Sequence, residues 1–138
     1  MSEFTHKLVA VLNKSIEPGK VMNALAHMTI GLGAAVGKEP LRFSDYRDAE
    51  GGSHPFISEM PFMILSANSN KIKNLRVECL ANNIQFTDFA ETMTSGGYEE
   101  QLARTAATKA DDLVYYGIVL FGDWAKVSEL TRKFSLWH

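Results

Sequence analysis

The chain has 138 residues, which suits one domain that buries a core of its own. Its hydrophobic fraction of 46%, charged fraction of 22% and formal net charge of −2 are ordinary for a protein in water, and nothing in this balance favours nucleic acid as a partner. No apolar run reaches the roughly 18 residues of a membrane-spanning helix. The stretch "MSEFTHKLVAV" lacks the parts of a secretion signal, so we expect a cytoplasmic protein without a membrane partner.

The first part of the chain predicts a strand followed by a helix. "HKLVAVLN", His6–Asn13, is a nearly continuous apolar run, typical of a strand that is buried on both faces. Pro18 favours the first turn of a helix, which we expect to run to about Val36. Residues 37–60 contain two prolines, three glycines and many polar residues, and we expect a long connection of the kind that often carries function.

The second part alternates strands and helices. Strands are predicted at residues 61–68, 84–93 and 113–122, the last being rich in β-branched and aromatic residues. Helices are predicted after each of them. Ser69 is the expected cap of the first, a Gly-Gly turn precedes the second, and Asp123 is the expected cap of the third. The expected inward stripes of the first and third helices are Ile72, Leu75, Val77 and Leu80, and Val127, Leu130 and Phe134.

This alternation predicts an α/β fold, arranged as a single three-layer domain over residues 1–138. The one cysteine, Cys79, excludes an intrachain disulfide and is expected to be a small buried hydrophobe. "GLGAAVG" ends a helix and has Val36 where a dinucleotide fingerprint needs glycine. The four histidines are far apart in sequence. We therefore expect neither a cofactor nor a metal.

The helix from Pro18 carries a band that combines polar and small residues. At about 100° per residue, one narrow face of this helix collects Lys20, Asn23, Ala24, His27 and Gly31. The opposite side collects Val21, Leu25, Met28 and Leu32, which we expect to pack on the sheet. Lys20 and Lys38 have no other charged residue between them, so we expect this helix to be mostly covered. The band is interpreted either as a shallow functional groove or as an ordinary solvated face.

The same segment resembles a known family. "KLVAVLNKSIEPGKVMNALAHMTIGLGA" is similar to the opening of the type II peptidyl-tRNA hydrolases, and the positions that match their motif are Gly19, Lys20, Ala26 and His27. The stretches "HPFIS", "PFMIL", "FTDFAETMTSGGYEE" and "YYGIVLFG" resemble more closely a bacterial family of unknown function with that fold. The resemblance implies a mixed sheet of four or five strands with helices on both faces.

Three departures from the hydrolase pattern bear on mechanism. Ala24 stands where the hydrolases have a glutamine. Aligned without gaps, their acidic residue falls on Glu91 and their arginine on Thr94. The resemblance therefore implies an inherited fold with altered chemistry.

Three functions follow as hypotheses, and whether the chain is an enzyme stays open. The first is a small-molecule-binding or catalytic pocket with Lys20 and Glu91 as its reactive pair, because such a pair can hold perturbed pKa values. The residues expected to line it are Asn23, His27, His54, Thr92 and Tyr98. The second is hydrolysis of peptidyl-tRNA or a related acylated RNA. The third is a non-catalytic interaction module, a homodimer paired through an edge strand.

Overall fold

Strand β1 lies in the middle of a five-stranded sheet with the order β5-β6-β1-β4-β7. The computed structural model describes residues 4–138. Its strands are β1 His6–Asn13, β2 Phe43–Arg47, β3 Ser53–Ser58, β4 Phe62–Ala67, β5 Gln85–Ala90, β6 Tyr115–Asp123 and β7 Ser135–Leu136. Its helices are α1 Pro18–Val36, α2 Lys38–Leu41, α3 Ser69–Ala81, α4 Tyr98–Ala106 and α5 Trp124–Thr131, with the short 3₁₀ turns η1 Glu91–Met93 and η2 Ala110–Asp112.

The sheet is mixed, as the family resemblance implied. β1 runs parallel to β4 and antiparallel to β6, while β5 pairs antiparallel with β6 and β7 antiparallel with β4. The crossover from β1 to its parallel neighbour β4 contains α1 and α2. The predicted bounds of β1 and α1 are confirmed.

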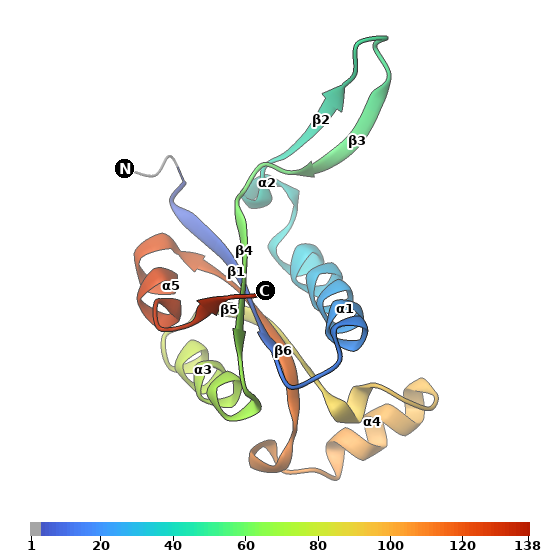
Figure 1. Ribbon diagram of the computed structural model, residues 1–138, viewed down its shortest axis with the longest axis vertical. Helices are drawn as coiled ribbons and strands as arrows, with labels where there is room; N and C mark the ends of the chain where they lie inside the picture. The colour runs from blue at the N-terminus through green and yellow to red at the C-terminus, as the bar shows by residue number, and fades with distance from the viewer. Residues whose placement is uncertain (1–3) are drawn as a thin grey trace.

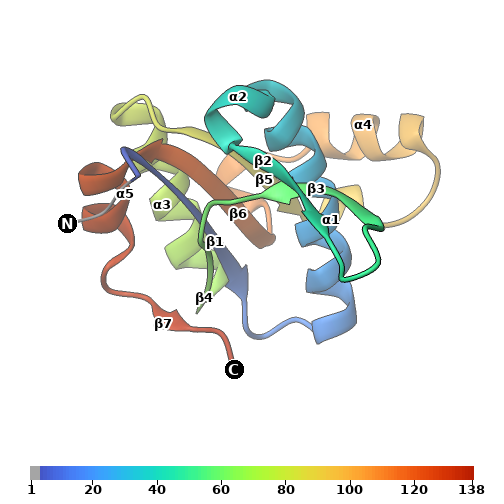
Figure 2. The same ribbon diagram turned by 90° about the horizontal axis from the view of Figure 1, so that it is seen from above.

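Helices cover both faces of this sheet, and alternation along β1 divides the core in two. Leu8, Ala10 and Leu12 pack in the cluster that contains the buried side of α1. Val9 and Val11 pack in the cluster that contains residues of α3 and α5. Figure 1 shows α1 on one side of the sheet and α3 with α5 on the other, and Figure 2 shows α4 on the same side as α1.

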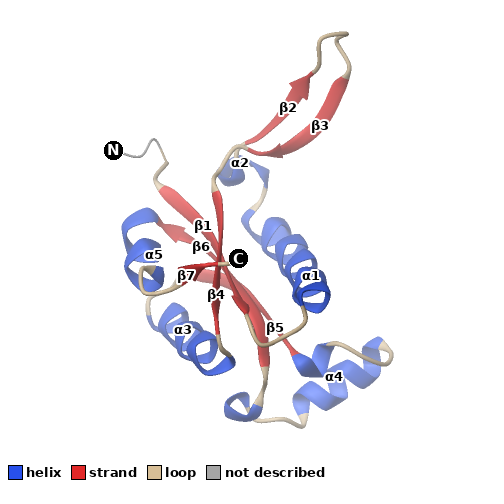
Figure 3. Cartoon of the chain, viewed as in Figure 1, coloured by secondary structure: helices blue, strands red, loops and turns tan. Residues whose placement is uncertain are grey.

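The expected long connection after α1 contains a β-hairpin instead. β2 and β3 pair antiparallel, and the hairpin extends away from the rest of the molecule (Figure 3). Most of its residues are exposed, so the alternation that marks a half-buried strand is missing. Pro55 lies within β3, and the register of the hairpin shifts beside it. Both features make this strand harder to predict from the sequence.

Capping and burial around α3 differ from the prediction. Asn68 is the N-cap, and its side chain accepts a hydrogen bond of 2.9 Å from the amide of Lys71. Ser69 Oγ accepts instead from the amide of Tyr115 at 2.9 Å, which joins α3 to β6. The predicted stripe is wrong for Val77 and Leu80, which are exposed; the buried residues of α3 are Ile72, Leu75 and Cys79. The predicted Asp123 cap of α5 is confirmed by its bond to the amide of Lys126.

A bulge in β6 shapes the α1 side of the sheet. Phe89 pairs with Gly117 and Ala90 with Tyr115, so Tyr116 is the extra residue between them. The bulge turns Tyr116 toward the cluster beneath α1. Gly117 suits this position because an added Cβ would lie 2.8 Å from Leu12 Cδ2 and 3.2 Å from the carbonyl oxygen of Val11. This end of β5 and β6 is where the candidate site lies.

Candidate functional site

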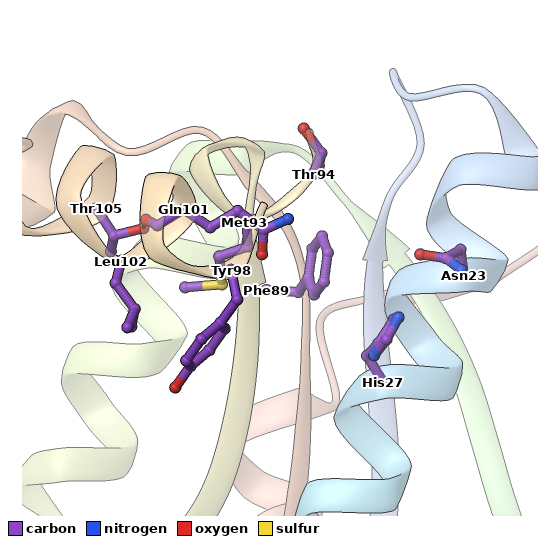
Figure 4. Close-up of a pocket in the computed structure, with 9 residues that line it drawn as sticks. All are labelled: Asn23, His27, Phe89, Met93, Thr94, Tyr98, Gln101, Leu102 and Thr105. Atoms are coloured by element: carbon purple, nitrogen blue, oxygen red, sulfur yellow. Dashed lines mark hydrogen bonds between the residues drawn. The ribbon is translucent and has the colours of Figure 1, made fainter. Parts of the chain in front are cut away.

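A groove separates α1 from the segment formed by η1 and α4. Two adjoining cavities of about 390 Å³ and about 370 Å³ occupy it, and both are lined by Asn23, Phe89 and Thr94. Figure 4 shows the larger cavity, with α1 on one side, α4 on the other and Phe89 between them. The smaller cavity continues toward the N-terminal end of α1, where Gly19 and Lys20 line it.

The α1 wall carries the predicted polar residues. Lys20, Asn23 and His27 lie on the exposed side of the helix and line the groove. β5 holds this helix in place, since Thr87 Oγ1 donates a hydrogen bond of 2.9 Å to the carbonyl of Met28. An added Cβ at Gly31 would make an ordinary van der Waals contact with Thr87 Cγ2 at 3.6 Å.

Two expectations about α1 are corrected. Ala24 is fully buried rather than part of the groove, because it lies at the border of the polar band and the sheet packing draws it inward. The helix is also less covered than predicted: Met22 and Ile30 are 62% and 72% exposed. Between Lys20 and its end at Val36, α1 carries no formally charged residue. Its exposed surface therefore consists of apolar and uncharged polar side chains, and the helix is not buried.

The floor of the groove is aromatic. Phe89, at the end of β5, is 8% exposed and stacks against His27 with 6.0 Å between the ring centroids. On its other side, the ring of Tyr116 lies 6.0 Å away at an angle of 38°. The bulge in β6 makes this possible, because it places Tyr116 beside Phe89. A row of three rings therefore runs from α1 to β6.

The opposite wall is one face of α4. Its lining residues follow the helical spacing i, i+3, i+4, i+7, and they are Tyr98, Gln101, Leu102 and Thr105. No residue of α4 is buried, and Tyr98 and Leu102 remain 73% and 52% exposed. This wall is thus a helix face of mixed polarity, and the rest of residues 4–138 covers it only in part.

Hydrogen bonds to the preceding loop hold α4 in position. The guanidinium of Arg104 donates to the carbonyl of Thr92 through Nε at 3.2 Å and Nη2 at 3.0 Å, and to the carbonyl of Ser95 at 2.6 Å. Thr105 Oγ1 and Thr92 Oγ1 are 2.8 Å apart. Between the two segments the chain turns at Gly96, whose φ of 80° favours glycine.

The structure brings together four of the seven residues predicted for the site. Lys20, Asn23, His27 and Tyr98 line the groove. Thr92 does not line either cavity, and its contacts are those that hold α4.

Glu91 and His54 lie elsewhere. Glu91 opens η1 with an exposed side chain and does not line either cavity, and within residues 4–138 no ion pair joins it to Lys20. His54 lies on the hairpin, where its Nε2 is 3.0 Å from Asp48 Oδ2. That hydrogen bond is the main cause that lowers the pKa of Asp48.

The electrostatics of the groove follow from its lining. Lys20 is the one formally charged side chain among the described residues that line the two cavities, and the rest are amides, hydroxyls, an imidazole and apolar groups. Such a set can hold an anionic group at the Lys20 end. Among the described residues the lining contains no carboxylate for acid–base work, which leaves the imidazole of His27 as its proton-transfer group.

Residues that the sequence reasoning missed form most of the apolar lining: Phe89, Met93, Leu102 and Tyr116, with the polar Gln101 and Thr105. The lining residues of α4 recur at helical spacing in "YEEQLART", so this wall of the groove could have been predicted from the sequence. Tyr116 had no such signal, because a bulge reorients it.

In the described part of the chain, no group of three His, Cys, Asp or Glu side chains is placed to hold a metal. Nor is any described helix long and apolar enough to cross a bilayer.

Fold and groove together define a mixed α/β protein with an open cleft beside its first helix. The chain belongs to the family described as "Protein of unknown function (DUF2000)", whose model matches residues 6–138. It is also similar to the solved structure of a protein of unknown function from Agrobacterium tumefaciens, with a TM-score of 0.86 and 19% identity over 98% of this chain and 99% of that one. At that identity the likeness shows the fold alone. No curated protein matches the sequence significantly.

These comparisons confirm the expected membership in a family of unknown function. The likeness to the type II peptidyl-tRNA hydrolases is not confirmed by them and stays a prediction.

Proposed function

We propose that the groove between α1 and α4 binds a small organic molecule that carries a negative charge. The observation behind this proposal is the lining itself, in which one cation, Lys20, lies at the end of a cleft with an aromatic floor. Ligand sites are commonly concave and mostly apolar, with a few polar groups that fix orientation. Lys20 is exposed and has no ion-pair partner within the described residues, so it is available to a ligand.

In this proposal, each of the three polar residues of the α1 wall has a role. Lys20 would hold the anionic group. Asn23 lines both cavities and would donate or accept a hydrogen bond at their junction. His27 would contact the ligand from the same side as its stacking partner Phe89.

Thermal denaturation in the presence of fractionated metabolite extracts tests this proposal. We expect at least one fraction to raise the Tm of the wild type, because ligand that binds only the folded chain stabilises it. Lys20→Ala should lose that shift. Lys38→Ala is the matched control, since it removes an exposed lysine just beyond the other end of α1 and should keep the shift. Absence of any shift for the wild type, or an equal shift for Lys20→Ala, would contradict the proposal.

Hydrolysis of peptidyl-tRNA is the alternative that the resemblance suggests. It is supported by Gly19, Lys20 and His27, which lie along the groove. It requires a group to orient water, and Glu91, on which the acidic residue of the hydrolases falls, does not line either cavity. Release of tRNA from an N-acetylated aminoacyl-tRNA at low salt, where contacts to phosphates are strongest, tests it. Failure to cleave under those conditions would end the hypothesis.

A homodimer is supported by a different surface, the hairpin. Tyr46, Phe56 and Ile57 are 53%, 50% and 60% exposed there. A two-stranded hairpin that extends alone into solvent is marginally stable, so a second copy would cover apolar side chains and steady the strands. Static light scattering should give twice the mass of the chain, and Ile57→Lys should return it to the mass of one copy. A single-chain mass for the wild type would contradict this.

A further inference from the structure

We propose that the ligand of the groove is a monocarboxylic acid with a planar apolar body, such as an aryl ring. Its carboxylate would contact Lys20, and its ring would lie between Phe89 and Tyr98. This inference rests on the proposed function, and it adds the chemical class of the ligand to it.

The number of charges in the lining argues for one negative charge on the ligand. Among residues 4–138, Lys20 is the only formally charged residue that lines either cavity. A phosphate dianion would keep about one uncompensated charge there, and phosphate sites generally use arginine forks or several cations. Arg104 could have supplied a fork, but its guanidinium is directed to the carbonyls of Thr92 and Ser95. A carboxylate matches the single ammonium.

The other end of the groove argues for an apolar, flat body. Met93, Leu102 and the ring of Tyr98 line the larger cavity together with Phe89 (Figure 4). Tyr98 and Leu102 are mostly exposed without a ligand, so covering them removes apolar surface from water. Phe89 already stacks with His27 and lies beside Tyr116, and aromatic rings favour such offset or tilted contacts.

The two ends are joined through Asn23, Phe89 and Thr94, which line both cavities. The carboxylate and the ring therefore belong to one ligand, with a short spacer at Asn23 and Thr94. A hydroxyl or amide on that spacer would find a hydrogen-bonding partner in the Asn23 side chain. A purely apolar molecule would leave this side chain and Lys20 without a contact.

A matched series of simple probes tests the class by ¹H–¹⁵N NMR titration. The probes are 3-phenylpropanoate, the neutral 3-phenylpropanamide, propanoate without the ring, and 2-phenylethyl phosphate. We expect 3-phenylpropanoate to bind with a Kd of about 1 mM, as suits a probe of this size. Its shift changes should lie at the amides of Gly19, Asn23 and Leu102. The amide and propanoate should bind about 5-fold weaker or worse, and the phosphate should also bind more weakly than the acid.

Two variants separate the charge from the rest of the groove. Lys20→Met should reduce the affinity for 3-phenylpropanoate to that for the amide, while Lys38→Met should leave it unchanged. The class is wrong if the amide or the phosphate binds as tightly as the acid, or if Lys20→Met has no effect. If no probe shifts the groove amides but a metabolite fraction still does, the class fails and the proposed function stands. If neither does, both fail.

Discussion

The imidazole ring of His27 stacks on the phenyl ring of Phe89, with 6.0 Å between their centroids and 27° between their planes. His27 comes from the exposed side of α1, and Phe89 from the buried end of β5. The contact therefore joins the polar wall of the groove to its floor. The same contact therefore belongs both to the packing of the fold and to the lining of the proposed ligand site.

The two partners of this stack should differ sharply in their effect on stability. Phe89→Ala removes a side chain that is 8% exposed and should lower the free energy of unfolding by about 3 kcal/mol, from lost burial and the cavity left behind. His27→Ala removes an exposed ring and should cost less than about 1 kcal/mol. Urea denaturation of both variants checks this, and equal costs would mean that His27 is part of the core.

Two glycines on the α1 side of the molecule should respond in opposite directions to a methyl group. An added Cβ at Gly117 would lie 2.8 Å from Leu12 Cδ2 and 2.9 Å from Met28 Cε, so Gly117→Ala should destabilise the fold by about 2 kcal/mol. Gly33 has nothing within 4 Å of that position and lies inside α1, so Gly33→Ala should stabilise it by about 0.5–1 kcal/mol. Thermal melts would show both signs. Stabilisation by Gly117→Ala would contradict the packing described for the β6 bulge.

The ion pair of Arg76 and Asp88 should make stability depend on pH. Its atoms are 3.0 Å apart, and burial raises the pKa of Asp88 above its ordinary value although Arg76 acts against this. A raised carboxyl pKa means that the folded state holds the proton more tightly. Stability is therefore lost as the pH rises from about 4 through the folded pKa, and the loss is complete above it.

Arg76→Met removes the group that limits this loss, so it should cost about 2–3 kcal/mol at pH 7 and clearly less at pH 4, where a larger share of Asp88 carries a proton. Chemical denaturation at the two pH values measures this. Lys126→Met, which breaks the exposed pair with Glu129, is the control and should cost about 0.5 kcal/mol or less at both. An effect of Arg76→Met that does not change with pH would refute the assignment.

Cys79 should be chemically silent in the folded chain. It is fully buried, and this burial, helped by the neighbouring charge of Glu78, raises the pKa of its thiol to about 12. At pH 8 only roughly one thiol in ten thousand would be ionised, and that one would be inaccessible. Labelling with an aromatic disulfide should therefore be slow without denaturant and fast in urea. Rapid labelling of the native chain would show that α3 opens easily.

Much of the fold could be predicted because its main elements have strong local signals. Pro18 and Gly37 mark the ends of α1, and β1 and β6 are apolar runs of strand length. The hairpin could not be predicted, because Phe56 and Ile57 are exposed and Pro55 interrupts the strand pattern. Its strands pair with each other and most of their residues are exposed, so they lack the hydrophobic alternation from which a strand is predicted.

The site was harder to predict than the fold. The spacing of Lys20, Asn23 and His27 on one helix face was sufficient to place them together. Glu91 follows β5 directly, but the turn of η1 sets its direction, and no local pattern reports that direction. The position of His54 depends on the path of residues 37–60, which contain the projecting hairpin, and that path could not be predicted. Of the residues predicted for the site, those on α1 and α4 line the groove, and those on η1 and the hairpin do not.

The proposed function depends on a contact between Lys20 and the negative charge of a ligand in the groove between α1 and α4. The most direct measurement is a ¹H–¹⁵N NMR spectrum of the labelled chain with and without a concentrated metabolite extract, for the wild type and Lys20→Ala. We predict shift changes confined to residues 19–27, 89–95 and 98–105 in the wild type and their loss in Lys20→Ala. Changes located elsewhere, or identical in the two proteins, would contradict the claim.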